Sequence, residues 1–212
     1  MVIKVLSENT SISSHFQAEH GLSLYVEANG RKLLFDTGAS ELFLENADRL
    51  DVDIADIDFV VISHGHYDHG GGLKAFFRHN KKAEVFIHTR AFEEHTARRK
   101  DGSEEYIGLD QELKHNKRFE FTGDRFFIAR GIEVFSNVIG RDMVSQSNRA
   151  LFVRRENESF EGTFEHEQNL IIREEDRMAL FAGCAHNGIV NIVRHFEELK
   201  RRHADYVFGG FH

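Results

Sequence analysis

The order of predicted elements indicates an α/β (α+β) fold in which two mixed β-sheets pack face to face and helices cover the outside. Strand patterns come first, then a helix, then further strands, and finally a helix and a strand. The segment 57–62 is almost continuously apolar, which is typical of a parallel strand buried on both faces. In each half of the chain an apolar strand ends in a corner of glycine and histidine that opens a helix, near 63–72 and 183–188. Such elements bury their apolar faces by stacking in layers.

The length and charge of the chain limit its class. Its 212 residues suit one domain with a single core, and the formal charge of -8 argues against generic nucleic-acid binding. No run reaches the roughly 18 apolar residues of a membrane span, and the first residues lack a secretory signal pattern. The single cysteine, Cys184, excludes an internal disulfide and agrees with a reducing compartment. We therefore expect one cytoplasmic domain over 1–212 without a membrane partner.

The first elements are a hairpin and a helix. The hairpin is predicted over 22–35, because two weakly alternating segments flank Asn29-Gly30, a pair that favours a type I′ turn. It ends in the polar corner Asp36-Thr37-Gly38. Ser40 can then cap a helix over 41–50, whose apolar residues recur at helical spacing.

The later elements follow the same two kinds of periodicity. The stretch 100–130 is polar and mixed in period, so we expect an excursion over the site rather than a second domain. The remaining predicted elements are helices at 73–78, 90–99 and 189–203, and strands at 57–62, 84–88, 133–137, 149–153, 169–173, 178–182 and 205–208.

A run of metal-ligand residue types follows the buried strand at 57–62: His64, His66, Asp68 and His69. Imidazole nitrogens and carboxylate oxygens bind zinc and similar ions, and ligand sites gather beyond the carboxyl ends of parallel strands. On an extended backbone His64 and His66 project to one side and can hold one ion together. Asp68 and His69 lie beyond the bend and can reach a second ion. A solvated histidine-rich run is the alternative, since the chain has 14 histidines, but the preceding strand favours a metal site.

The spacing of this run resembles the HxHxDH signature of the metallo-β-lactamase superfamily, and Asp36-Thr37-Gly38 resembles the superfamily's first motif. Segments 63–73, 183–192 and 209–212 are similar to one branch, named after dihydropterin ribofuranosyl-aminobenzene phosphate synthase. The likeness covers about 19–212. It implies a four-layer αββα sandwich with a binuclear metal site at one edge of the paired sheets.

The resemblance also implies how the metals would be held. His64 and His66 would bind the first metal and Asp68 and His69 the second, while His212 matches the histidine that closes the second site.

The position of a bridging aspartate in many superfamily hydrolases is occupied here by Cys184, which would bridge the metals, lie nearby or be inert. Thiolate favours softer ions than carboxylate does. His186, in the branch motif, is the preferred further ligand, and His166 ranks below it.

Other polar residues are less strongly indicated as parts of the metal site. Asp36 would either cap a turn or fix the tautomer of a metal-bound imidazole. His88 is an ordinary strand-end histidine more often than a ligand. The remaining histidines fall on presumed helices or polar loops and are expected at the surface, among them His95, His115, His195 and His203.

The predicted function is metal-dependent hydrolysis. Two adjacent divalent cations lower the pKa of a shared water and supply hydroxide at neutral pH, and they stabilise charge that develops on an oxygen. Asp68, or a histidine freed from metal ligation, would pass a proton to the leaving group. We expect two zinc ions, with manganese and iron as alternatives, and a small-molecule, phosphate-bearing substrate, with phosphoesters favoured. The alternatives are a condensing synthase acting on a phosphoribosyl-type compound, and a metal-binding scaffold or sensor without turnover.

Overall fold

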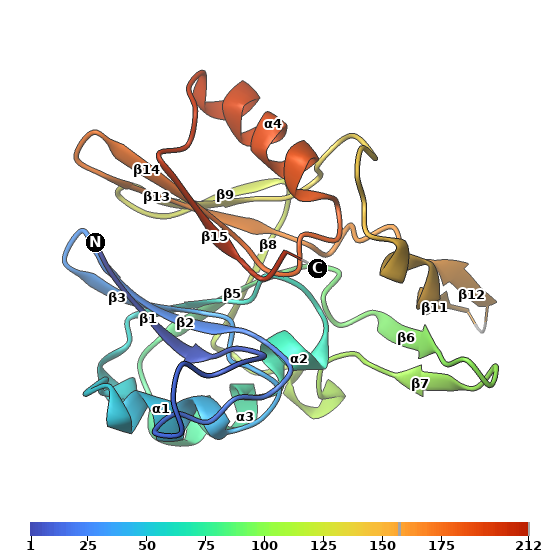
Figure 1. Ribbon diagram of the computed structural model, residues 1–212, viewed down its shortest axis with the longest axis horizontal. Helices are drawn as coiled ribbons and strands as arrows, with labels where there is room; N and C mark the ends of the chain where they lie inside the picture. The colour runs from blue at the N-terminus through green and yellow to red at the C-terminus, as the bar shows by residue number, and fades with distance from the viewer. Residues whose placement is uncertain (157, 212) are drawn as a thin grey trace.

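The computed structural model describes residues 1–156 and 158–211. Over these residues two large β-sheets pack face to face, and helices lie on their outer faces (Figure 1). This is the layered α/β arrangement that the sequence predicts. No helix in the described part of the chain is long and apolar enough to cross a membrane.

The first sheet carries the predicted metal loop. Its strand order over the described residues is β1-β2-β3-β4-β5-β8, and the last four strands run parallel to one another. Helices α1 (Leu42–Arg49) and α3 (Leu73–His79) cover its outer face (Figure 1). Because β3, β4 and β5 are parallel, their carboxyl ends meet at one edge of the sheet. The strands are β1 (Val2–Ser7), β2 (Ser23–Ala28), β3 (Arg31–Phe35), β4 (Phe59–Val61), β5 (Glu84–His88) and β8 (Phe119–Thr122).

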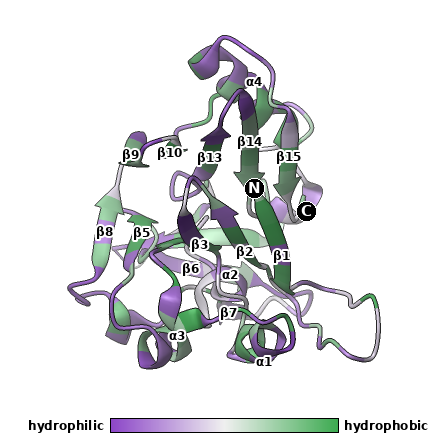
Figure 2. Cartoon of the chain, turned by 90° about the vertical axis from the view of Figure 1, so that its left-hand side faces the viewer, coloured by the Kyte–Doolittle hydropathy of each residue, from purple (hydrophilic) through white to green (hydrophobic). Residues whose placement is uncertain are grey.

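The second sheet has the order β15-β14-β13-β10-β9 within the described ranges, and α4 (Ile189–Lys200) covers its outer face. The hydropathy view shows the strands of the two sheets, with many apolar residues, between α4 at one end and α1 and α3 at the other (Figure 2). The strands are β9 (Arg125–Ala129), β10 (Ile132–Phe135), β13 (Asn169–Glu174), β14 (Arg177–Ala182) and β15 (Tyr206–Gly209).

A small third sheet extends from one side of the sandwich (Figure 1). Its order is β12-β11-β6-β7 among the described residues. The described part of the chain also contains three short 3-10 helices: η1 (Ile54–Asp56), η2 (Gln111–Leu113) and η3 (Gln146–Ala150). The strands are β6 (Glu94–Arg98), β7 (Glu104–Tyr106), β11 (Leu151–Arg155) and β12 (Glu158–Glu161).

The core between the two large sheets contains phenylalanines contributed by both. Phe35 of β3 and Phe181 of β14 are fully buried, and their ring centroids lie 5.9 Å apart at an interplanar angle of 50°. Aromatic pairs in this geometry add to the stabilisation that burial provides. Contacts of this kind between the two sheets therefore hold the sandwich together.

Replacing Phe181 by alanine is expected to lower the free energy of unfolding by about 3–5 kcal/mol, because it leaves a cavity between the sheets. Urea denaturation of the metal-free chain measures this loss. Phe127→Ala is the matched control, since that ring is 65% exposed and its loss should change stability little. Equal losses for the two variants would contradict the assigned core.

The predicted hairpin and its turn are confirmed. β2 and β3 pair antiparallel around Asn29 and Gly30, whose φ angles are 53° and 70°. Positive φ at both central residues is the requirement of a type I′ turn, and asparagine and glycine tolerate it. Local chemistry alone determines this element.

The predicted helix at 90–99 is wrong. Its second half is the strand β6, which pairs antiparallel with β11, with Phe152 opposite Thr96. Glutamate, alanine and arginine favour helices, so the local preference indicated one. The pairing partner lies more than fifty residues later in the chain, and its hydrogen bonds override a preference of a few tenths of a kcal/mol per residue.

The predicted excursion at 100–130 is shorter than expected. β7 joins the small third sheet, whereas β8 pairs parallel with β5 and β9 pairs with β10. The end of this stretch therefore belongs to both large sheets. Its polar residues misled the prediction because edge strands keep one face in solvent.

Candidate metal centre

The loop after β4 carries the four predicted ligands into the interior. Strand β4 ends at Val61, and the short helix α2 (Tyr67–Gly70) begins two residues after Gly65. A Cβ atom on Gly65 would overlap the carbonyl of Ala91, so glycine is needed there for a close approach between the two segments. His64, His66, Asp68 and His69 are all buried as a result.

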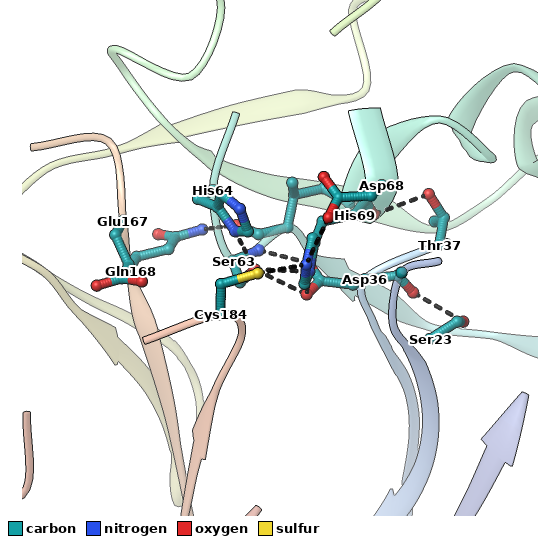
Figure 3. Close-up of polar contacts among 12 residues, drawn as sticks. Ser23, Asp36, Thr37, Ser63, His64, Asp68, His69, Glu167, Gln168 and Cys184 are labelled. Carbon is teal, nitrogen blue, oxygen red and sulfur yellow. Dashed lines mark hydrogen bonds and ion pairs between the residues drawn. The ribbon is translucent and has the colours of Figure 1, made fainter. Parts of the chain in front are cut away.

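Asp36, at the end of β3, organises this loop (Figure 3). Its Oδ1 accepts the Ser63 backbone N–H at 2.6 Å, and its Oδ2 accepts the Ser63 hydroxyl at 2.7 Å. The same Oδ2 lies 2.6 Å from His69 Nδ1. Asp36 itself has a φ of 61° and is fully buried. The carboxylate therefore acts on the metal loop, in the manner expected of a residue that orients imidazoles.

These hydrogen bonds determine which nitrogen of each ring carries the proton. A carboxylate can only accept, so the proton of His69 lies on Nδ1. The Ser63 hydroxyl donates to Asp36 and therefore accepts from His64 Nδ1 at 2.8 Å. In the neutral His64 ring Nε2 is left with its lone pair. Within the described residues His64 Nε2 is buried without a hydrogen-bond partner, and His69 Nε2 lies 3.0 Å from Cys184 Sγ.

His186 reaches the same cluster from the corner after β14. Its ring lies 4.9 Å from that of His64 and 5.0 Å from that of His66, measured between centroids. The buried carboxylate of Glu167 holds the corner by accepting the backbone N–H groups of His186 at 2.7 Å and of Asn187 at 2.9 Å. Burial raises the pKa of Glu167, although these hydrogen bonds oppose the shift.

Asp68 faces both the cluster and a histidine that sequence reasoning missed. His20 Nε2 lies 3.3 Å from Asp68 Oδ2, and the side chain of His20 is 57% exposed. Burial alone would raise the pKa of Asp68, but His69, His20 and His66 outweigh it and hold the pKa well below its usual range. No periodicity around His20 could have indicated this contact.

Three imidazoles of the cluster resist protonation. Burial lowers the pKa values of His64, His66 and His166, and each neighbouring ring lowers them further. His69 differs: burial lowers its pKa, but the negative groups at Cys184, Asp36 and Asp68 reverse the direction and raise it. The three neutral imidazoles, beside a carboxylate and a thiol, are suitable ligands for a borderline-soft divalent cation.

Among the described residues, three groups of side chains could each hold one ion, because their ligand atoms lie within 4.8 Å of one another. The structure therefore brings together five of the predicted ligands in two groups that share His64, and Asp68 lies beside them with its Oδ2 3.6 Å from His69 Nε2. The predicted ligand His212 lies outside the described residues. The groups are His64 with His69 and Cys184, His64 with His66 and His186, and His66 with His95 and His166.

The third group corrects the prediction for His95. This residue was expected at the surface, yet it is 2% exposed and its ring centroid lies 4.0 Å from that of His166. The error follows from the wrong helix at 90–99, because only strand pairing turns His95 inward. His166 Nδ1 accepts the backbone N–H of Gly65 at 2.9 Å, so the proton of its neutral ring lies on Nε2.

The remaining histidines of the described ranges lie outside the three groups. His115 and His203 are exposed, as expected, whereas His195 is half-buried and stacks on Phe135. His88 is buried at the end of β5, where its Nδ1 accepts the backbone N–H of Arg90 at 3.2 Å.

Comparison with known proteins supports the family resemblance that the sequence motifs indicate. Residues 17–186 match the family model of the metallo-beta-lactamase superfamily. The crystal structure of Tm1679, a metal-dependent hydrolase of the beta-lactamase superfamily, superposes with a TM-score of 0.83 at 32% identity, covering 99% of this chain and 76% of that one. A quorum-quenching N-acyl homoserine lactone lactonase, 15% identical with a TM-score of 0.54 over 89% of this chain and 78% of that one, shares the fold.

Two relatives come from Methanocaldococcus jannaschii. One is an uncharacterised protein, 29% identical over 216 residues that cover all of this chain and 79% of the relative. The other is 7,8-dihydropterin-6-methyl-4-(beta-D-ribofuranosyl)-aminobenzene-5'-phosphate synthase, 29% identical over 220 residues that cover 94% of this chain and 73% of the relative. With the family model matched over most of its length, this chain belongs to the metallo-beta-lactamase superfamily.

Proposed function

We propose that this protein is a hydrolase that binds two divalent cations, with zinc as the favoured metal at both sites, and that it acts on a small phosphoester. The observation that carries the proposal is the buried Nε2 of His64, which has a lone pair and no hydrogen-bond partner among the described residues. A buried acceptor left in this way is costly unless another group binds it. A metal ion shared with neighbouring rings would bind it.

The ligands divide between the two ions. His64, His66 and His186 would hold the first ion, and Asp68, His69 and Cys184 would hold the second together with His212. The 3.0 Å contact between Cys184 Sγ and His69 Nε2 supports a role for Cys184 at the second ion rather than as a space-filling residue. Burial raises the pKa of its thiol, and a bound cation would favour the thiolate.

When bound, the two cations would supply an activated nucleophile at neutral pH and stabilise negative charge on the substrate. The protein's own groups would orient the reactants. Asp68 has a strongly lowered pKa and stays ionised, so its Oδ2 would accept a hydrogen bond from the attacking water. His20, in contact with Asp68 and partly exposed, would carry the released proton to solvent.

A phosphate-bearing substrate is supported by the synthase among the relatives, whose name specifies a 5'-phosphate product. The same relative supports the second candidate function, a condensing synthase on a phosphoribosyl-type compound. The hydrolase named in the similar crystal structure, 32% identical over 99% of this chain, supports hydrolysis as the first.

The test measures metal content and turnover together. We expect about two equivalents of zinc per chain, loss of phosphoesterase activity after chelation, and recovery when zinc is added. His64→Ala should lower both metal content and turnover, because it removes a member of two groups, whereas His115→Ala at the surface should change neither.

Three other outcomes would contradict the first candidate function. Activity that survives complete metal removal would exclude the proposed chemistry. Condensation of a pterin with a phosphoribosyl compound, without phosphoester hydrolysis, would favour the synthase. Two bound metals with neither reaction would favour a scaffold or sensor.

A further inference from the structure

Asn148, on η3 between β10 and β11, contacts His186 with both ends of its side-chain amide. Its Nδ2 donates to the His186 backbone carbonyl at 2.8 Å, and its Oδ1 lies 2.9 Å from His186 Nδ1. Asn148 is half-buried, and 38 residues separate it from His186 in the sequence. No motif in the chain connects the two.

The two hydrogen bonds together determine the protonation of the His186 ring. A carbonyl oxygen can only accept, so the Asn148 NH2 group must face the carbonyl, and Oδ1 must then face the ring. Because Oδ1 is an acceptor, His186 Nδ1 must carry the proton. In the neutral ring Nε2 therefore keeps its lone pair, as in His64.

The orientation of the His186 ring is also fixed. Phe164 stacks on His186 with centroids 4.5 Å apart and an interplanar angle of 9°, which sets the plane of the imidazole. Glu167 holds the His186 backbone N–H from another side. The segment that carries Asn148 is itself tied to α4, because Asn191 Nδ2 donates to the Asp142 carbonyl at 2.9 Å.

We propose that Asn148 is a positioning residue that holds His186 in the Nδ1–H tautomer and so presents Nε2 to the ion shared with His64 and His66. The proposal rests on the metal site described under the proposed function. His166 provides the contrast, since a backbone N–H occupies its Nδ1 and places the proton on Nε2. Of His166 and His186, His186 is therefore the residue whose Nε2 lone pair can bind a metal.

Two measurements test the proposal on the full chain. Nitrogen-15 NMR of the metal-free protein, labelled at histidine and assigned with His186→Gln, reports which nitrogen of His186 is protonated. Competition with a chromophoric chelator gives the zinc affinity of each equivalent. In Asn148→Ala we expect loss of the Nδ1–H tautomer and about 10–100-fold weaker binding of one equivalent.

Two variants separate orientation from folding. Asn148→Asp keeps an acceptor for Nδ1–H and should keep the tautomer and nearly the wild-type affinity, because carboxylates commonly orient metal-bound imidazoles. Ser147→Ala, an exposed neighbour in the same turn, should behave as wild type.

An unchanged tautomer in Asn148→Ala, or equal weakening by Asn148→Ala and Asn148→Asp, would overturn the proposal. Failure of the proposed function would look different: the wild-type chain would bind no zinc, while the tautomer of His186 would still depend on Asn148.

Discussion

Replacing Asp36 by asparagine is expected to weaken zinc binding by about 10–100-fold and to reduce turnover at limiting zinc accordingly. The carboxylate accepts from the Ser63 N–H, from the Ser63 hydroxyl and from His69 Nδ1–H. An amide has one acceptor oxygen, so its NH2 group would face donors. The His69 ring and, through Ser63, the His64 ring would lose the partners that keep their protons on Nδ1.

The measurement is a zinc competition titration alongside urea denaturation of the metal-free chain. Asp53→Asn is the matched control, because Asp53 is exposed and caps η1 by accepting the Ala55 N–H at 2.9 Å, which asparagine does equally well. Unchanged zinc affinity in Asp36→Asn with reduced stability would show that Asp36 supports only the fold.

Replacing Glu167 by alanine is expected to lower the free energy of unfolding by roughly 3–5 kcal/mol, because several buried donors lose their acceptor together. These donors are the backbone N–H of His186, the backbone N–H of Asn187 and its side-chain Nδ2 at 2.9 Å. The turn they stabilise includes Ala185 at a φ of 57°, which relies on these contacts.

Urea denaturation of metal-free Glu167 variants measures the effect. Glu167→Gln keeps one acceptor oxygen and should fall between wild type and Glu167→Ala. Glu165→Ala is the control, since Glu165 is half exposed and pairs with Arg90 at the surface, where an ion pair contributes about 0–1 kcal/mol. A similar small loss for Glu165→Ala and Glu167→Ala would contradict the role assigned to the buried carboxylate.

Elements whose signals are local could be predicted closely from the sequence. The I′ turn at Asn29-Gly30 needs residues that tolerate positive φ, and the strand before the metal loop needs an apolar run. Strand β5 was predicted with the bounds observed, Glu84–His88. Each of these depends on the preferences of residues close together in the chain.

Elements whose partners are distant could not be predicted. The strand β6 has helix-favouring residues, and it is a strand because β11 pairs with it. His95 was placed at the surface for the same reason, and only the pairing with β11 buries it against His166. Preferences of single residues are weaker than the hydrogen bonds and packing that a distant strand provides.

The sequence by itself determined which ligand types this protein has and where the main metal loop begins. The run from His64 to His69 directly follows a buried strand, and its members are only one or two residues apart. The tertiary structure alone decided how the rings are oriented. Asp36, Glu167 and Asn148 act on histidines up to 38 residues away along the chain. Hydrogen bonds between such residues depend on which strands pair and how the loops fold at their ends, which no local pattern encodes.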